Sequence, residues 1–141
     1  MIQIQRIKSP QKEKAYQLMK VCYPERNHDI IHLKAILSQE SNIIVTVSYE
    51  GKVIGGATAY IIDMITRLCK ELFVYEVGIE ESFQCKGYGK MLMEYLFKLA
   101  ESERCDKVFV ITEQSNIKAN KLYKSAGCKG DHAVCYTHII N

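Results

Sequence analysis

The 141-residue sequence contains no apolar run long enough to span a membrane. A transmembrane helix needs roughly 20 consecutive apolar residues, and no stretch of the chain approaches that length. The N-terminal sequence MIQIQRIKSPQKEK also lacks the apolar core of a signal peptide. We therefore expect a cytoplasmic protein that has no membrane partner.

A large excess of either charge is missing too. The formal net charge is +3, with 19 basic and 16 acidic side chains. This balance falls far short of the basic surface that nucleic-acid-binding domains carry, so we expect no nucleic-acid partner. The slight positive charge mildly favours a ligand that carries phosphate.

The six cysteines lack the close spacing of a metal site or a redox pair. No C-x-x-C sequence occurs, and the nearest neighbours, Cys128 and Cys135, are separated by a segment that contains His132. Scattered thiols of this kind are typical of proteins in a reducing compartment. We predict free cysteines, no disulfide and no metal.

Linkers, internal repeats and low-complexity segments are also absent from the sequence. Hydrophobic residues make up 48% of the chain and charged residues 25%, which is the ordinary balance of a soluble globular domain. A chain of 141 residues suits one compact domain and is short for two domains of ordinary size. We predict a single domain over residues 1–141.

Periodicity in the sequence predicts both strands and helices. Alternating or β-branched segments predict strands at residues 2–7, 42–49, 53–62, 71–79, 107–112 and 133–140. Amphipathic segments with capping residues and proline or glycine stops predict helices at about 10–23, 30–37, 88–101 and 116–126. This order of elements predicts a mixed α/β domain in which helices pack on a central sheet.

A glycine-containing loop joins the predicted strand 71–79 to the predicted helix that begins at Tyr88. Backbone N–H groups at a helix start lack partners, and the helix dipole adds partial positive charge, so phosphate is the natural ligand. A P-loop is excluded because Met91 stands where its hydroxyl residue belongs. A dinucleotide-binding loop is excluded because Leu92 replaces its third glycine. A tight turn that binds nothing is the remaining alternative.

The loop reads Q-x-x-G-x-G, with Gln84, Gly87 and Gly89 as the stated residues. It resembles motif A, [RQ]-x-x-G-x-[GA], of the GNAT superfamily of acetyl-coenzyme A (acetyl-CoA) dependent N-acetyltransferases. Further along, NIKANKLYKSAGC resembles a second motif of that superfamily, N-x-x-A-x-x-L-Y-x-x-x-G-F, except that Cys128 replaces the usual aromatic residue. The segment YEGKVIGGATAY also resembles the second and third strands of the family. The resemblance covers nearly the whole chain and implies the GNAT fold, a mostly antiparallel sheet of six to seven strands flanked by about four helices.

The resemblance also implies where acetyl-CoA binds. Its pyrophosphate is expected on the loop residues Gln84, Cys85, Lys86, Gly87, Tyr88, Gly89 and Lys90. Its pantetheine arm is expected along Val77, Gly78 and Ile79. A glycine inside a strand allows a ligand or another backbone to approach closely, or allows a bulge. An N–H group freed at such a bulge would bond the thioester carbonyl and stabilise its oxyanion.

Acetylation needs a neutral amine, so a base must take a proton from an ammonium group whose pKa is about 10. Glu76 is the predicted base. The period of a strand places it on one face with Leu72, Val74 and Gly78, where partial burial would raise the pKa of its carboxyl. Some aminoglycoside 3-N-acetyltransferases resemble the chain here, with a carboxylate in a similar stretch. The alternatives are that Glu76 only pairs with a basic neighbour, or that Glu71 is the base, although we expect Glu71 to be a solvated strand end.

Tyr123 is the predicted general acid. In the family that the chain resembles, the tyrosine of the second motif protonates the departing CoA thiolate. The alternative is an aromatic residue on the core stripe of its helix, with its hydroxyl at the surface. Asn116 is expected to contact the cofactor, to cap its helix, or to do both.

The resemblance implies direct transfer of the acetyl group to a primary amine in a ternary complex, because no cysteine stands where the family would use one as nucleophile. We predict a small-molecule amine as the acceptor. A protein or peptide N-acetyltransferase of the ribosomal-protein N-terminal type is the first alternative, and a non-catalytic CoA-binding module is the second. Dimerisation is common in the family, which keeps open a homodimer in which the last strand pairs or exchanges.

Overall fold

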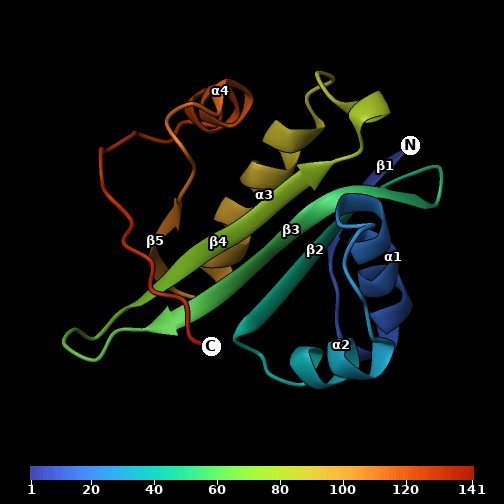
Figure 1. Ribbon diagram of the computed structural model, residues 1–141, viewed down its shortest axis with the longest axis horizontal. Coiled ribbons are helices and arrows are strands. Elements are labelled where there is room, and N and C mark those ends of the chain that lie inside the picture. The colour runs from blue at the N-terminus through green and yellow to red at the C-terminus, as the bar shows by residue number, and fades with distance from the viewer.

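A computed structural model describes residues 1–141 and contains one five-stranded sheet (Figure 1). The strands lie in the order β1-β2-β3-β4-β5, and all neighbours are antiparallel except β4 and β5, which are parallel. The strands are β1 (Ile2–Arg6), β2 (Asn42–Tyr49), β3 (Lys52–Asp63), β4 (Lys70–Ile79) and β5 (Cys105–Val110). The helices are α1 (Lys12–Cys22), α2 (Ile30–Leu37), α3 (Tyr88–Ser102) and α4 (Ile117–Ser125). This mixed architecture of strands and helices confirms the predicted fold class.

The sheet has fewer strands than the six to seven expected. The prediction of a strand at 133–140 is wrong, because no strand forms after α4. Residues 129–141 make no backbone hydrogen bond to any part of the chain. A strand exists only when a neighbour completes its ladder of hydrogen bonds, and β-branched residues alone do not supply that neighbour.

The helices agree with the predicted positions except at the start of α1. Residues Ser9–Gln11 form a short 3₁₀ turn, and the Gln11 side chain accepts a hydrogen bond from the Lys8 N–H at 3.0 Å. The α-helix therefore begins at Lys12 instead of Pro10. Asp29 caps α2 by accepting the Ile31 N–H at 2.8 Å. None of the helices has both the length and the apolar content needed to cross a membrane.

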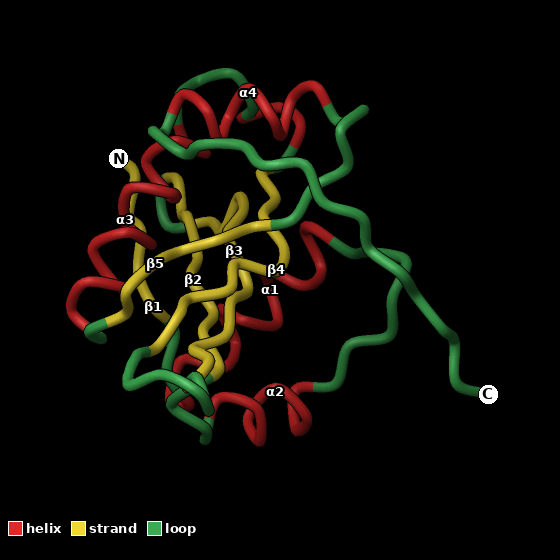
Figure 2. The backbone as a smooth tube through the Cα atoms, turned by 90° about the vertical axis from the view of Figure 1, so that its left-hand side faces the viewer, coloured by secondary structure: helices red, strands yellow, loops and turns green.

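Two hydrophobic clusters lie on opposite faces of the sheet. On one face α3 packs over β4 and β5, and α4 packs beside α3 (Figures 1 and 2). The fully buried side chains of this cluster include Val45, Leu72, Val74, Leu92 and Leu96. On the other face α1 and α2 cover β2 and part of β3, with Leu18, Leu33, Ile44 and Val53 at the centre. The burial of these apolar surfaces is the main driving force for the fold.

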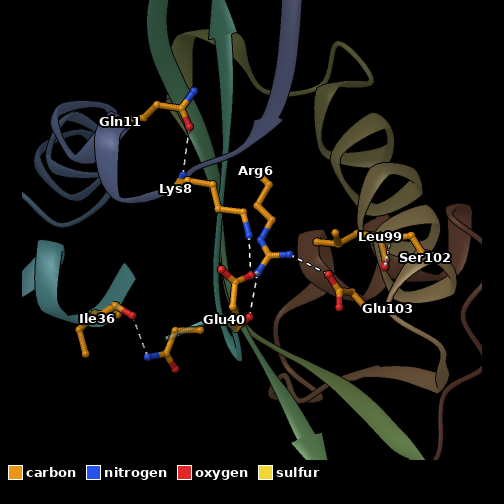
Figure 3. A network of polar contacts seen from close by, with 9 residues as sticks. Arg6, Lys8, Gln11, Ile36, Glu40, Leu99, Ser102 and Glu103 are labelled. Atoms are coloured by element: carbon orange, nitrogen blue, oxygen red, sulfur yellow. Dashed lines mark hydrogen bonds and ion pairs between the residues drawn. The ribbon is translucent and has the colours of Figure 1, made fainter. Parts of the chain in front are cut away.

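Arg6, at the end of β1, connects three separate elements (Figure 3). Its guanidinium donates to the Glu103 carboxylate at 2.9 Å and to the Glu40 carbonyl oxygen at 2.8 Å. Its own backbone N–H donates to the Tyr95 hydroxyl at 2.9 Å. Lys8 adds an ion pair to Glu40 at 2.8 Å. These bonds fix α3 and the α2–β2 turn to the first strand, so they support the sheet from which the functional residues project.

Candidate active site

The loop between β4 and α3 presents a row of backbone donors. The N–H groups of Cys85, Lys86, Gly87, Tyr88, Gly89 and Lys90 have no acceptor within the chain. The first helical bond of α3 runs from the Met91 N–H to the Gly87 carbonyl oxygen at 3.1 Å. Six free donors at the start of a fifteen-residue helix, together with the positive end of its dipole, make an anion site.

The backbone of this loop is held in an unusual conformation. Gly87 has φ +86°, and a Cβ atom added there would meet nothing within 4 Å, so the space above it is open. Cys85 has φ +61°, a left-handed conformation that is uncommon outside glycine. A loop in which residues of right- and left-handed conformation follow one another is a common backbone feature of anion-binding concavities. The loop therefore has the donor set and the room that a pyrophosphate requires.

Gln84 has a different part in the loop from its neighbours. Its backbone N–H donates to the Glu81 carbonyl oxygen at 3.1 Å, so this group is not free for a ligand. Its side-chain amide donates to the Ile79 carbonyl oxygen at 2.8 Å. Gln84 thus ties the start of the loop to the end of β4. This contact gives a physical reason for a glutamine at the first position of the motif.

The second half of β4 has one unpaired edge. The parallel pairing with β5 ends at Val74 opposite Val110, whereas β4 continues to Ile79. The backbone of residues 75–79 is therefore bonded to β3 on one side only. The residues expected to hold pantetheine, Val77, Gly78 and Ile79, lie on this edge. An extended ligand that carries amide groups fits such an edge in the way that an added strand would.

Gly78 is not the site of the bulge. The register of β3 and β4 shifts between Thr58 and Ala59, which leaves Tyr75 as the extra residue of β4. Gly78 instead allows a close approach, because a Cβ atom there would lie 2.9 Å from the Cys22 Sγ atom. The expected bulge at Gly78 is therefore wrong, and the expected approach of a ligand or another backbone stays a prediction. The side chain that approaches it comes from the end of α1.

The bulge at Tyr75 changes the face on which Glu76 lies. Val74 is opposite Ala59 and Glu76 is opposite Thr58, and residues opposite each other share a face of the sheet. Because Thr58 and Ala59 are successive residues of one strand, they point to opposite faces. The prediction that Glu76 shares a face with Leu72 and Val74 is therefore wrong. Glu76 points toward α1, while Val74 points toward α3.

Glu76 lies in a cluster of polar side chains from the end of α1. Its side chain is 27% exposed and is 3.3 Å from the Arg26 guanidinium. That guanidinium is stacked over the Tyr23 ring at 4.2 Å. Burial, and then a hydrogen bond to the Glu76 carboxylate, raise the pKa of the Tyr23 hydroxyl well above its ordinary value. His28 bonds the Tyr23 carbonyl oxygen at 2.6 Å and so fixes the turn that carries these residues.

A small pocket lies between this turn and β4. Its volume is about 240 Å³, and it is lined by Val21, Cys22, Tyr23, Val77, Gly78, Ile79, Glu80 and Glu81. The predicted pantetheine residues thus share a pocket with the end of α1. Burial, followed by the charges of Glu76 and Glu80, raises the pKa of the Cys22 thiol to about 11. This thiol is therefore a neutral wall of the pocket at ordinary pH and not a nucleophile.

Tyr123 lies on α4 and, like Val77, Val110 and Leu122, packs against the core cluster on the α3 side of the sheet. Burial is the main cause of a raised pKa for its hydroxyl, with a smaller contribution from Cys128. The hydroxyl makes no hydrogen bond within the chain, so it is free to donate to a ligand. The partly buried ring agrees with the predicted core stripe. It also leaves a protonated donor at the side of β5.

Asn116 caps α4, as predicted. Its side-chain oxygen accepts the Ala119 N–H at 3.1 Å. Asn120, which we did not predict, donates to the carbonyl oxygens of Glu113 and Asn116 at 3.1 and 2.7 Å. This side chain holds the β5–α4 loop against the start of the helix. The contact of Asn116 with the cofactor stays a prediction.

Glu71 is not a solvated strand end. Its side chain is only 8% exposed, and its carboxylate pairs with Arg67 at 3.1 Å and with Lys107 at 3.5 Å. It lies near the start of β4, whereas the loop of free N–H groups follows the other end of that strand. A buried carboxylate that has two cationic partners forms a structural ion pair. Glu71 is therefore remote from the residues that Glu76 joins.

Tyr23 and Arg26 are the site residues that the sequence reasoning missed. Tyr23 is the last residue of the predicted first helix, and Arg26 follows Pro24 in a segment without periodicity. A weak signal was present, since an aromatic and an arginine close together in a short turn often stack. Elsewhere in the chain, no group of three or more His, Cys, Asp or Glu side chains is arranged to hold a metal ion. All the cysteines are free.

Comparison with solved structures shows the same fold in several acetyltransferases. An aminoglycoside acetyltransferase from an uncultured soil metagenomic sample, solved with sisomicin, has a TM-score of 0.91 and 19% identity over 99% of this chain and 96% of its own. Aminoglycoside acetyltransferase AAC(6')-Iy, solved with a bisubstrate analogue, has a TM-score of 0.85 and 18% identity over 100% and 99% of the two chains. A ribosomal-protein-alanine N-acetyltransferase from Brucella melitensis has a TM-score of 0.78 and 14% identity over 99% and 100%.

No curated protein sequence matches the chain. The sequence model of the acetyltransferase (GNAT) family, by contrast, matches residues 6–128 and so includes both the loop between β4 and α3 and the helix α4. The free donors of the loop and the unpaired edge of β4 suit the acetyl-CoA that this family uses. The chain belongs to the GNAT family and is an acyl-CoA dependent N-acetyltransferase.

Proposed function

We propose that the protein acetylates a primary amine of a small molecule by direct transfer in a ternary complex with acetyl-CoA. The observation that carries this proposal is the pairing of Glu76 with Arg26 beside the pocket at the end of α1. The Arg26 side chain is 55% exposed, so this ion pair is weak and open to exchange. A carboxylate that already binds a guanidinium suits the ammonium group of a cationic acceptor.

The cofactor residues follow from the same geometry. The N–H groups of the loop 85–90 would hold the pyrophosphate, with Gln84 supporting the loop. Val77, Gly78 and Ile79 would hold the pantetheine arm, and Asn116 would lie beside it. When bound, acetyl-CoA supplies the activated acetyl group.

Each predicted catalytic residue then has one role. The Glu76 carboxylate exchanges Arg26 for the acceptor ammonium and takes its proton, and Tyr23 orients the carboxylate through its hydroxyl. The Tyr123 hydroxyl, which burial keeps protonated, gives a proton to the departing sulfur. Cys22 forms no covalent intermediate, because its thiol is kept neutral.

The structural neighbours support a small cationic acceptor. One was solved with sisomicin, and AAC(6')-Iy was solved with CoA-S-monomethyl-acetylneamine, which joins CoA to an aminoglycoside fragment. Because these two chains are less than 20% identical to this one, the comparison shows a common fold and not a common substrate. The proposal therefore depends on the anionic site around Glu76, and the neighbours indicate which amines to test first.

The test is an acceptor screen with the purified protein and acetyl-CoA, measured by the release of CoA. The panel contains aminoglycosides, polyamines, amino acids and short peptides that begin with alanine. We expect turnover with an aminoglycoside or polyamine and at least tenfold lower kcat/KM with the peptides. Turnover with peptides alone would establish the peptide alternative. Binding of acetyl-CoA by calorimetry without turnover of any amine would establish a non-catalytic module.

A further inference from the structure

Three side-chain hydroxyls on the face of the sheet that α1 covers are buried and have no hydrogen-bond partner within the chain. They belong to Thr46 and Ser48 on β2 and to Thr58 on β3. A hydroxyl that loses its water on folding and gains no partner costs free energy, so such groups are uncommon and require a physical reason. Thr58 is the one of the three that lies beside the proposed base.

Thr58 is directly opposite Glu76 in the pairing of β3 with β4. Residues opposite each other project to the same face, and their Cβ atoms lie about 4.5–5.5 Å apart. A Cβ atom added at Gly56, two residues before Thr58, would lie 3.1 Å from the methyl carbons of Leu18 on α1, which identifies this face as the one toward α1. The Thr58 hydroxyl therefore lies on the side of the sheet where Glu76 pairs with Arg26.

Thr46 has a different neighbourhood, although its side chain is the same. It is opposite Gly56 on β3 and Gln5 on β1, and neither of these residues carries a charge. It is fully buried, whereas Thr58 is partly exposed. Thr46 thus shares with Thr58 the face of the sheet and the lack of a partner, but it has no carboxylate across from it. This makes it a matched control for Thr58.

The Glu76 carboxylate needs a partner that stays when its cation is exchanged. Arg26 and Tyr23 both reach it from the turn that follows α1, and Arg26 leaves it when the acceptor ammonium binds. A guanidinium only donates hydrogen bonds, so it suits the ionised carboxylate alone. A hydroxyl also accepts them, so it suits the base before and after proton transfer. Thr58 offers such a hydroxyl from a strand that is paired on both sides.

We propose that Thr58 is a positioning residue for the base: when the acceptor ammonium displaces Arg26, the Thr58 hydroxyl donates a hydrogen bond to the Glu76 carboxylate. This bond fixes the orientation of the carboxylate toward the amine. The inference rests on the proposed function, because it assigns a supporting group to the same reaction. The acceptor proton moves from nitrogen to a Glu76 carboxylate oxygen, and the neutral nitrogen then attacks the thioester carbon. Thr58 keeps its own proton throughout, and after the transfer its oxygen accepts a hydrogen bond from the protonated carboxyl.

The first test compares Thr58→Val with Thr46→Val in steady-state kinetics, with the amine that the acceptor screen identifies. Each change replaces a buried, unpartnered hydroxyl by a methyl group, so neither variant should lose stability in urea denaturation. Thr58→Val should lower kcat roughly tenfold and leave the KM for acetyl-CoA unchanged, whereas Thr46→Val should keep the kcat of the parent. Thr58→Ser retains the hydroxyl and should keep kcat within about twofold of the parent. Equal kcat in the two valine variants would overturn the proposal.

A second comparison shows whether Thr58 acts through Glu76. When Thr58→Val is added to Glu76→Gln, kcat should fall no further, because the group that the hydroxyl positions is already gone. A further tenfold loss in the double variant would show that the hydroxyl acts on another group, and it would refute the assignment.

A spectroscopic test needs no acceptor. Arg26→Ala removes the cation that holds the Glu76 carboxylate, so the hydrogen bond from Thr58 should form in the free protein. The protein is labelled with carbon-13 at its glutamate carboxyl groups, and the Glu76 resonance is assigned by its loss in Glu76→Gln. This resonance should move when Thr58→Val is added to Arg26→Ala, and it should stay in place when Thr46→Val is added instead.

The outcomes separate this inference from the proposed function. A Glu76 resonance that ignores Thr58→Val would overturn the hydrogen bond, even in an enzyme that turns over a small amine. Absence of turnover with every amine would refute the proposed function, and the resonance would still decide whether Thr58 bonds Glu76.

Discussion

The two ends of β4 each carry a glutamate, and these two carboxylates differ in every respect that matters for chemistry. Glu71 is 8% exposed, lies where β4 is bonded on both edges, and has two cationic partners. Glu76 is 27% exposed, lies where one edge of β4 is free, and has one cationic partner, Arg26, whose side chain is 55% exposed. One strand therefore carries a structural carboxylate at one end and an available carboxylate at the other.

The difference comes from the backbone between them. The extra residue at Tyr75 reverses the face on which the following side chains lie, and the pairing with β5 stops at Val74. Before this point β4 is the interior of a sheet, where a charge must be paired to be tolerated. After it, the strand borders open space, where a carboxylate can exchange one cation for another. A single bulge thus separates the half of β4 that holds the structural ion pair from the half that carries the proposed base.

The largest expected effect comes from removing the negative charge of Glu76, the proposed base. Glu76→Gln should lower kcat/KM roughly 1000-fold, because no carboxylate then takes the proton of the acceptor. It should also remove the acidic limb of the pH–rate profile, measured with a saturating acceptor. Glu71→Gln is the matched control and should keep the profile of the parent. An unchanged profile in Glu76→Gln would assign the base to a water chain.

A substitution of Tyr123, which lies on the other face of the sheet, tests the proton transfer to the departing sulfur. Tyr123→Phe should lower kcat roughly 100-fold without changing the KM for acetyl-CoA, because only the proton to the leaving sulfur is lost. The raised pKa of this hydroxyl keeps it protonated, so the parent enzyme should not lose kcat through Tyr123 below about pH 10. Equal kcat in the variant would remove Tyr123 from the reaction.

A substitution at Glu71 should lower the free energy of unfolding and should not change the rate of acetylation. Glu71→Gln leaves Arg67 and Lys107 without their anionic partner, and we expect a loss of about 1–3 kcal/mol in the free energy of unfolding. Urea denaturation followed by circular dichroism measures it. Glu76→Gln should change the same quantity by less than about 1 kcal/mol, since its ion pair is solvated. If the two variants lose equal stability, the contrast between the two ends fails.

Removing the Arg26 side chain should change the KM for the acceptor by a smaller factor. If it competes with the acceptor for Glu76, Arg26→Ala should lower the KM for a cationic acceptor by up to about fivefold, as expected for an exposed ion pair. Lys98→Ala, an exposed cation on α3, is the control and should leave the KM unchanged. A higher KM in Arg26→Ala would mean instead that this guanidinium contacts the acceptor.

Cys22 gives the smallest effect, in the pH dependence of stability. Its pKa rises from 9.0 to about 11 on folding, so the unfolded chain loses the thiol proton first. The contribution of the protonated thiol to the free energy of unfolding is therefore complete below pH 9, and it is lost as the pH rises toward 11. The parent should therefore lose more stability than Cys22→Ala between these pH values in urea titrations. Parallel curves would show that the thiol is not buried against Gly78.

The local elements were predictable from the sequence because their causes are local. The strand β2, the helix α2 with its Asp29 cap and the start of α3 at Tyr88 follow from periodicity and capping alone. The motif with Gly87 likewise predicted a loop of free N–H groups before a helix. The C-terminal strand was mispredicted because a strand depends on a partner that the sequence of one chain does not specify.

The amino-acid sequence determined the family, the glycine-containing loop before α3 and the identities of Glu76 and Tyr123 as candidates, since these depend on residue types at short spacings. The tertiary structure decided which face Glu76 occupies and that Tyr23 and Arg26 surround it. It also decided that Glu71 is a structural ion pair. The physical reason is that a bulge arises from the pairing of two strands, and contacts between α1 and β4 arise from packing. Neither is contained in the periodicity of either segment alone.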